Sequence, residues 1–178
     1  CTDDFAGHLK NNLNLAIKAT VGIASYAQLL FECDEIEKGK EYRKIAESFA
    51  KEISDFADGK THLPLTWGTG EETFSLKYNF AFDKVLGLNL FNQELFEKEV
   101  EYYLSKAERY GVPLDNRKMY TKSDWLLWVA RLTGDVQKRK ALIGMIDDYL
   151  KTSPDRIPFG DWYETQDGSY HEFRARSV

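Results

Sequence analysis

The most constraining feature of the sequence is an alternation, repeated three times, between two kinds of predicted helix. In each pair the first segment is apolar on nearly every side, and the second carries charge along one face. The apolar segments span residues 13–31, 78–91 and 125–132, and their charged partners span 38–59, 92–111 and 135–154. A helix that is hydrophobic all round must be surrounded by protein, whereas an amphipathic helix can face water. The alternation therefore predicts an all-α fold with three inner and three outer helices.

Composition narrows the class of protein. The net charge of −5 and the lack of a basic block longer than residues 138–140 argue against nucleic-acid binding. The apolar first helix contains Asn14, Lys18 and Gln28, so no membrane span is expected. The length of 178 residues predicts a single helical-hairpin domain over residues 1–178. Its ends, Cys1 and Val178, suggest a fragment of a longer multidomain protein with no visible signal segment.

The loops predict where a site would lie. Turns within each helix pair are short, whereas the segments between pairs, residues 58–76, 111–121 and 153–178, are long and rich in aromatic and acidic residues. If the paired helices are antiparallel, every long segment enters an inner helix at its N-terminus, where the helix dipole favours anions. We therefore expect these segments and the N-terminal CTDD to form one pocket rim. Residues 159–173 alternate around a DG turn and predict a short β-hairpin.

The first acidic candidates are Asp3 and Asp4, which precede or open the first predicted helix behind Thr2. One carboxylate could reach the pocket as an acid or a base, but capping of the helix and its dipole would use the same residues. A helix running through this segment would place Asp4, His8 and Asn12 on one face. His8 is then either a substrate-binding residue or a hydrogen-bonded core residue.

The second group lies before residues 125–132. Thr121 and Asp124 fit a capping box, yet Asp124 also opens an inner helix and is a candidate catalytic residue. Asp115 and Arg117 lie just upstream, and an Asp and an Arg beside a helix N-terminus could hold a substrate carboxylate. An internal salt bridge between Asp115 and Arg117 would use the same side chains. Both interpretations stay open.

The third group comprises Asp161, followed directly by Trp162, and Arg174 near the end of the chain. Aromatic rings next to a carboxylate suit a sugar or another polar ligand, and they are equally common in a loop that packs down. Asp83, inside the second apolar segment, is expected to be structural, because a buried carboxylate needs a cation or a donor from a neighbouring helix.

Several chemistries are not indicated by the sequence. Three scattered histidines and the absence of H-x-x-x-H and C-x-x-C make a metal site improbable. No P-loop, G-x-G-x-x-G or G-x-S-x-G occurs, so neither a nucleotide cofactor nor a serine nucleophile is predicted. We expect no cofactor.

Four segments together resemble the glutaminase A family: CTDDFAGHLKNNLNLAIKATVGIASYAQL, FSLKYNFAFDKVLGLNLF, GVPLDNRKMYTKSDWLLWVA and PFGDWYET followed by FRARSV. The resemblance implies an (α/α) toroid, in which this chain supplies about three hairpins of a six-hairpin, glycosidase-like ring. The family is named for secreted fungal glutaminases and has many bacterial relatives. The resemblance thus implies a secreted, periplasmic or cell-surface location and a gut Bacteroidetes-type bacterial source.

The family name implies hydrolysis of L-glutamine to L-glutamate and ammonia. Only acidic motifs carry over from the resemblance: Asp3 and Asp4 in CTDDF, Asp124 in TKSDW and Asp161 in FGDWY. In this hypothesis Asp124 or Asp161 activates water, and Asp3 or Asp4 assists the leaving ammonia.

Arg117 or Arg174 would hold the substrate carboxylate in the same hypothesis. A glycoside hydrolase is the first alternative, and it requires two carboxylates about 5 to 9.5 Å apart beside a platform such as Trp67 or Trp162. The second alternative is a non-catalytic domain that binds a glycan or a peptide, and it gains if the acidic motifs are separated or internally paired. The expected partners are a small substrate (glutamine or a sugar), the remainder of the parent protein and a second copy of the fragment.

Overall fold

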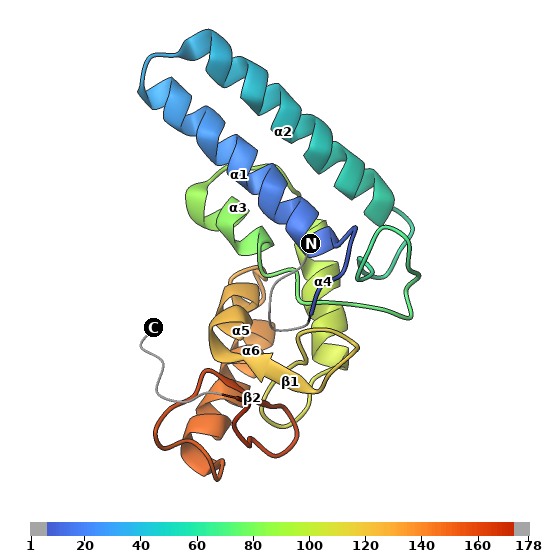
Figure 1. The fold of residues 1–178 in the computed structure, drawn as a ribbon, viewed down its shortest axis with the longest axis vertical. Coiled ribbons are helices and arrows are strands. Elements are labelled where there is room, and N and C mark those ends of the chain that lie inside the picture. Colours follow the sequence, from blue (N-terminus) through green and yellow to red (C-terminus); the bar gives the residue numbers. More distant parts are fainter. Residues whose placement is uncertain (1–6, 173–178) are drawn as a thin grey trace.

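A computed structural model describes residues 7–172 of the chain, and within this range it contains six helices and a two-stranded antiparallel sheet (Figure 1). The elements are α1 (Leu13–Glu32), α2 (Ile36–Ala57), α3 (Phe80–Leu86), α4 (Gln93–Ser105), β1 (Tyr120–Lys122), α5 (Ser123–Ala130), α6 (Val136–Thr152) and β2 (Trp162–Glu164). The predicted all-α class and the number of helices are confirmed. The toroid and the count of three hairpins stay predictions.

The helices are arranged as the alternation predicts. α1 and α2 form a long antiparallel arm, and α3 packs against α1 on the side away from α2 (Figure 1). α3 also contacts α5, while α6 packs against both α4 and α5. The three apolar helices thus form a continuous row, α1–α3–α5, and the charged helices α2 and α6 cover it.

The start of α1 differs from the sequence expectation. Asn12 is the N-cap, and its Oδ1 accepts a hydrogen bond from the Leu15 backbone N–H at 3.0 Å. Asn11 just before it has a positive φ of 59°, so the chain turns there instead of continuing as a helix. Thr2 is therefore not the cap of α1, and the predicted helical face shared by His8 and Asn12 is wrong.

The second apolar helix is shorter than predicted. α3 ends at Leu86 because Gly87 adopts a left-handed conformation with φ 64°. The Asp83 carboxylate accepts hydrogen bonds from the backbone N–H groups of Leu90 and Phe91, which bends the remaining apolar segment into the turn before α4. Burial raises the pKa of Asp83. Its role is structural, as expected, but its donors come from the following turn and not from a neighbouring helix.

The apolar helices are not surrounded on all sides by the described residues. Leu29 of α1 is 57% exposed, Val85 of α3 is 64% exposed and Leu127 of α5 is 48% exposed. The prediction of complete burial is therefore wrong within residues 7–172. No helix in this range is long and apolar enough to cross a membrane.

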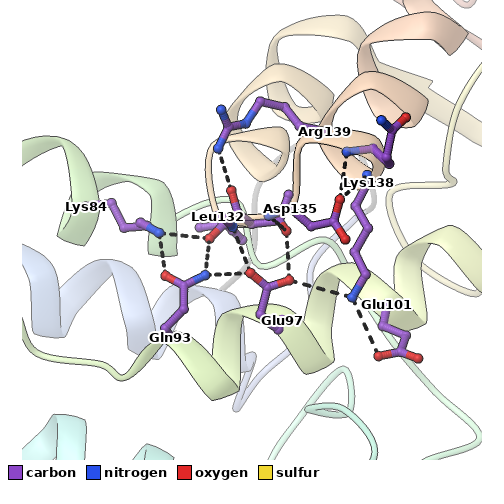
Figure 2. A network of polar contacts seen from close by, with 11 residues as sticks. Lys84, Gln93, Glu97, Glu101, Leu132, Asp135, Lys138 and Arg139 are labelled. Atoms are coloured by element: carbon purple, nitrogen blue, oxygen red, sulfur yellow. Dashed lines mark hydrogen bonds and ion pairs between the residues drawn. The ribbon is translucent and has the colours of Figure 1, made fainter.

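A polar network ties α3, α4 and the α5–α6 turn together (Figure 2). The Glu97 carboxylate accepts hydrogen bonds at 2.7 Å from the Thr133 hydroxyl and from the Gly134 backbone N–H. Lys84 donates to the Leu132 carbonyl at 2.9 Å. This network holds the turn that begins α6 and explains why α5 and α6 form a hairpin.

The C-terminal β-hairpin is present in reduced form. The His171 backbone N–H donates to the Trp162 carbonyl at 3.0 Å, and the Glu164 backbone N–H donates to the Ser169 carbonyl at 2.8 Å. The chain therefore turns back near the DG dipeptide. The regular pairing of β2, however, is with β1, in the register Lys122↔Trp162. Because β1 leads directly into α5, this sheet joins the C-terminal loop to the start of an inner helix.

Candidate active site

The segments that precede the three apolar helices meet at one place, as predicted. Asn12 at the start of α1, Tyr78 before α3 and Trp125 of α5 line a cavity of about 10 Å³ together with Asp115 and Arg117. A cavity of this size is close to the minimum that holds one water molecule. The segments before α1, α3 and α5 do meet here, but this space is far smaller than a glutamine side chain, none of residues 153–172 lines it, and the CTDD segment lies outside the described residues.

Backbone and side-chain hydrogen bonds fix this convergence. Leu76 donates its backbone N–H to the Leu114 carbonyl at 2.8 Å, which joins the loop before α3 to the loop before β1. The Asn79 side chain donates to the Asn14 carbonyl at 3.2 Å and so ties α3 to α1. The loops are therefore part of the rigid fold at this end of the helices.

Two of the predicted catalytic acids lie around one buried lysine. The Lys122 Nζ is 2.5 Å from Asp161 Oδ2 and 3.5 Å from Asp124 Oδ1. The side chains of Lys122 and Asp161 are each 2% exposed, whereas Asp124 is 22% exposed. Buried charges are tolerated when they are paired, so Lys122 and Asp161 satisfy each other while Asp124 keeps access to water.

The sheet determines the geometry of this cluster. The β1–β2 register places Lys122 opposite Trp162, next to Asp161, and the Ser123 backbone N–H donates to the Asp161 carbonyl at 2.9 Å. Residues 39 positions apart in sequence thus form a contact that the backbone holds.

Asp124 does not form the predicted capping box. α5 begins at Ser123 without a side-chain cap, and Asp124 Oδ1 accepts a hydrogen bond from the Trp125 backbone N–H at 3.0 Å. Thr121 lies in β1, where its hydroxyl is buried. Burial, followed by the charges of Tyr149 and Asp124, raises the pKa of the Tyr163 hydroxyl, so this group is a neutral phenol near the Asp124 carboxylate.

Asp115 and Arg117 form the internal salt bridge that the sequence left as an alternative. Arg117 Nη2 is 2.6 Å and Nε is 3.1 Å from Asp115 Oδ2. The Arg117 backbone N–H also donates to Asp115 Oδ1 at 2.7 Å. Asp115 is therefore committed to holding Arg117 at the wall of the cavity, and the role of either residue in substrate binding stays a prediction.

The two predicted tryptophans differ in burial: Trp67 is half-buried and Trp162 is buried. Trp67 packs against Phe56 with ring centroids 4.8 Å apart. Trp162 is 4% exposed and packs edge-on against Tyr120. The sugar-platform interpretation of Trp162 therefore lacks the exposed ring face it requires, and that of Trp67 stays a prediction.

The remaining predicted residues are His8, Asp3, Asp4 and Arg174. His8 lies in an irregular segment before α1 and is exposed. Asp3, Asp4 and Arg174 fall outside the described residues. Among residues 7–172, no group of three or more His, Cys, Asp and Glu side chains is placed to hold a metal ion.

Sequence reasoning missed Lys122, which is central to the site, and the stacked pair Tyr78 and Trp125, whose ring centroids are 3.9 Å apart. In the sequence, nothing except their apolar character distinguished Tyr78 and Trp125. Lys122 precedes Asp124 by two residues in the TKSDW motif, and this proximity to a candidate acid was the one available indication.

Comparison with known proteins identifies the family. Residues 1–178 match the family described as the glutaminase A six helical-hairpin domain. Glutaminase A of Aspergillus oryzae is 33% identical over 173 residues, which cover 95% of this chain and 25% of that protein. A probable glutaminase of Arthroderma benhamiae is 28% identical over 210 residues, covering 99% of this chain and 24% of that protein. The chain thus spans about a quarter of the length of these relatives, and it belongs to the glutaminase A family.

Proposed function

We propose that this chain contributes active-site residues to a glutaminase A-like amidohydrolase that converts L-glutamine to L-glutamate and ammonia. The observation that carries the proposal is the position of Asp124. It is the solvent-accessible carboxylate of the Lys122 cluster and lies at the start of α5, directly before Trp125, which lines the cavity between the segments that precede the apolar helices. The two relatives named as glutaminases support the choice of reaction.

In this mechanism the Asp124 carboxylate takes a proton from water while the water oxygen bonds to the amide carbonyl carbon of the substrate. The carbon–nitrogen bond then breaks, and the nitrogen takes up a proton and leaves as ammonia. Asp161 is too deeply buried to reach substrate, so the water-activating role passes to Asp124. Donation to the leaving nitrogen by Asp3 or Asp4, and binding of the substrate carboxylate by Arg117 or Arg174, remain part of the proposal.

The exposed apolar side chains of α1, α3 and α5 bear on the partner of this chain. We propose that other parts of the parent protein cover them, because exposed apolar patches usually mark an interface. Association with a second copy is the alternative for the isolated chain. A secreted or cell-surface location remains part of the proposal.

The glycoside-hydrolase alternative is weaker. The Asp124 and Asp161 oxygens both lie within 3.5 Å of the Lys122 nitrogen, so they are close enough for the separation that such enzymes use. The lysine ammonium, however, lies between them, where a glycosidic bond would have to be. Asp115 is paired with Arg117, and Asp161 is paired with Lys122. Because these candidate acids are paired internally, a non-catalytic binding domain is the main alternative to the amidohydrolase.

The test is ammonia release from glutamine by the intact parent protein, run beside a panel of oligosaccharides. Asp124→Asn should lower kcat by roughly 100- to 10,000-fold, the range for loss of a general base. Asp55→Asn, an exposed carboxylate on α2, is the matched control and should behave as wild type. Full ammonia release by Asp124→Asn would refute the assignment of Asp124. No release by the wild-type protein would refute the glutaminase activity, and ligand binding without turnover would favour the binding domain.

A further inference from the structure

Lys122 makes more contacts than charge balance requires. Its ammonium is fully matched by Asp161, which is equally buried and 2.5 Å away. A second carboxylate, Asp124, nevertheless lies 3.5 Å from the same nitrogen, and this one is partly open to solvent. Among residues 7–172, Lys122 therefore contacts two carboxylates, and Asp124 is the more accessible of the two.

The two oxygens of Asp124 have different surroundings. Oδ1 accepts the Trp125 backbone N–H at 3.0 Å and is also the oxygen nearest Lys122. Oδ2 accepts no hydrogen bond from the residues that the structure describes. Oδ1 is thus held by one hydrogen bond and one longer ionic contact, and Oδ2 remains available to accept a proton.

We propose that Lys122 is a positioning residue, which, anchored by Asp161, holds the Asp124 carboxylate in a single orientation for proton abstraction. The inference rests on the proposed function, in which Asp124 activates water. Lys122 itself does not touch the substrate. Its backbone position is set by the pairing of β1 with β2, so the ammonium is fixed in space and can fix Asp124 in turn.

A purely structural ion pair makes a different prediction. If Lys122 only neutralises Asp161, replacing both with neutral side chains of similar shape leaves Asp124 unaffected, since such replacements of buried pairs are often well tolerated. If Lys122 positions Asp124, the same replacement frees the carboxylate to rotate. A misplacement of about 1 Å near the chemistry can cost roughly 100-fold in rate.

The experiment compares the wild-type parent protein with the double variant Lys122→Met/Asp161→Asn. The matched control is Arg109→Gln/Asp148→Asn, which removes an exposed ion pair of 3.0 Å on a different part of the fold. We expect the Lys122 double variant to fold, to lose roughly 10- to 100-fold in kcat, and to keep its KM within about threefold. In its crystal structure the Asp124 carboxylate should adopt a new orientation. A folded double variant with wild-type kcat and an unmoved Asp124 overturns the proposal.

Two further measurements cover the other outcomes. If the double variant does not fold, Lys122→Arg keeps the charge opposite Asp161 but moves its donors. A loss of kcat in this folded variant supports positioning, and unchanged kcat overturns it. If the wild-type protein releases no ammonia, the proposed function fails, and the positioning role is judged from the orientation of Asp124 in the two crystal structures alone.

Discussion

Lys77 gives a stability prediction that can be worked out from its surroundings. Its side chain is completely buried before α3, where Nζ donates to the Leu63 carbonyl at 3.1 Å and to the carbonyl and hydroxyl oxygens of Ser75 at 3.0 Å. No carboxylate among the described residues lies within salt-bridge distance of it. Burial lowers the pKa of Lys77 from 10.5 to about 8, although the charges of Glu99 and Asp115 oppose the shift.

The sign of the pH effect follows from this lowered pKa. Between pH 8 and 10.5 the unfolded chain keeps a proton on Lys77 that the folded chain has released, so the free energy of unfolding rises with pH over this window. Below pH 8 both states are protonated, and burying the charge opposes folding. At 1.36 kcal/mol per pKa unit, the rise attributable to Lys77 is roughly 3 kcal/mol.

The assay is urea unfolding followed by tryptophan fluorescence at several pH values from 7 to 10.5, for the wild type and Lys77→Met. Methionine cannot titrate, so the difference in unfolding free energy between the two proteins should grow in favour of the wild type by roughly 3 kcal/mol across the range. Lys44→Met, an exposed position on α2, serves as the control and should show no such growth. A difference that stays constant from pH 7 to 10.5 would refute the reasoning.

Two other predictions concern single hydrogen-bonded side chains. Glu97→Gln removes the negative charge that accepts hydrogen bonds from the α5–α6 turn (Figure 2). The free energy of unfolding should fall by about 1–2 kcal/mol, and the Gly134 amide hydrogen should exchange with solvent roughly tenfold faster. Unchanged exchange at Gly134 would contradict this prediction. Burial lowers the pKa of His62, so its neutral form stabilises the fold above pH 6.5, and this contribution is lost as the pH falls through the lowered pKa. In urea unfolding, the free energy of unfolding of His62→Gln should therefore fall less between pH 7 and pH 5 than that of the wild type. If the two proteins showed the same pH dependence, His62 would not be the titrating group.

The helices could be predicted from the sequence because each has a strong period, but their ends could not. The second apolar segment continues through Leu88 and Leu90 with only Asn89 between them, yet α3 stops at Leu86. What ends it is the left-handed Gly87 and the capture of two later backbone N–H groups by Asp83. Both depend on how the turn packs, and a pattern of apolar residues does not reveal that.

The meeting of the segments before the apolar helices could be predicted for a different reason. Short turns and long loops determine which helix ends lie together, so the meeting of the segments before α1, α3 and α5 follows from chain connectivity. The pairing of side chains within the proposed site does not follow from chain connectivity. Asp115 and Arg117 are two residues apart and were recognised as a possible salt bridge, whereas Lys122 and Asp161 are brought together only by a three-residue sheet.

The two buried lysines differ in a way that supports placing the proposed site before α5 and not before α3. Lys77 and Lys122 occupy similar places, each within the last few residues before an apolar helix, where the helix dipole disfavours a cation. Lys77 donates to neutral oxygens alone and is sealed from solvent, so it has no accessible acid to act upon. Lys122 lies against a carboxylate on each side, and one of these, Asp124, reaches water. Of these two arrangements, the one before α5 therefore offers the accessible carboxylate that the proposed amide hydrolysis requires.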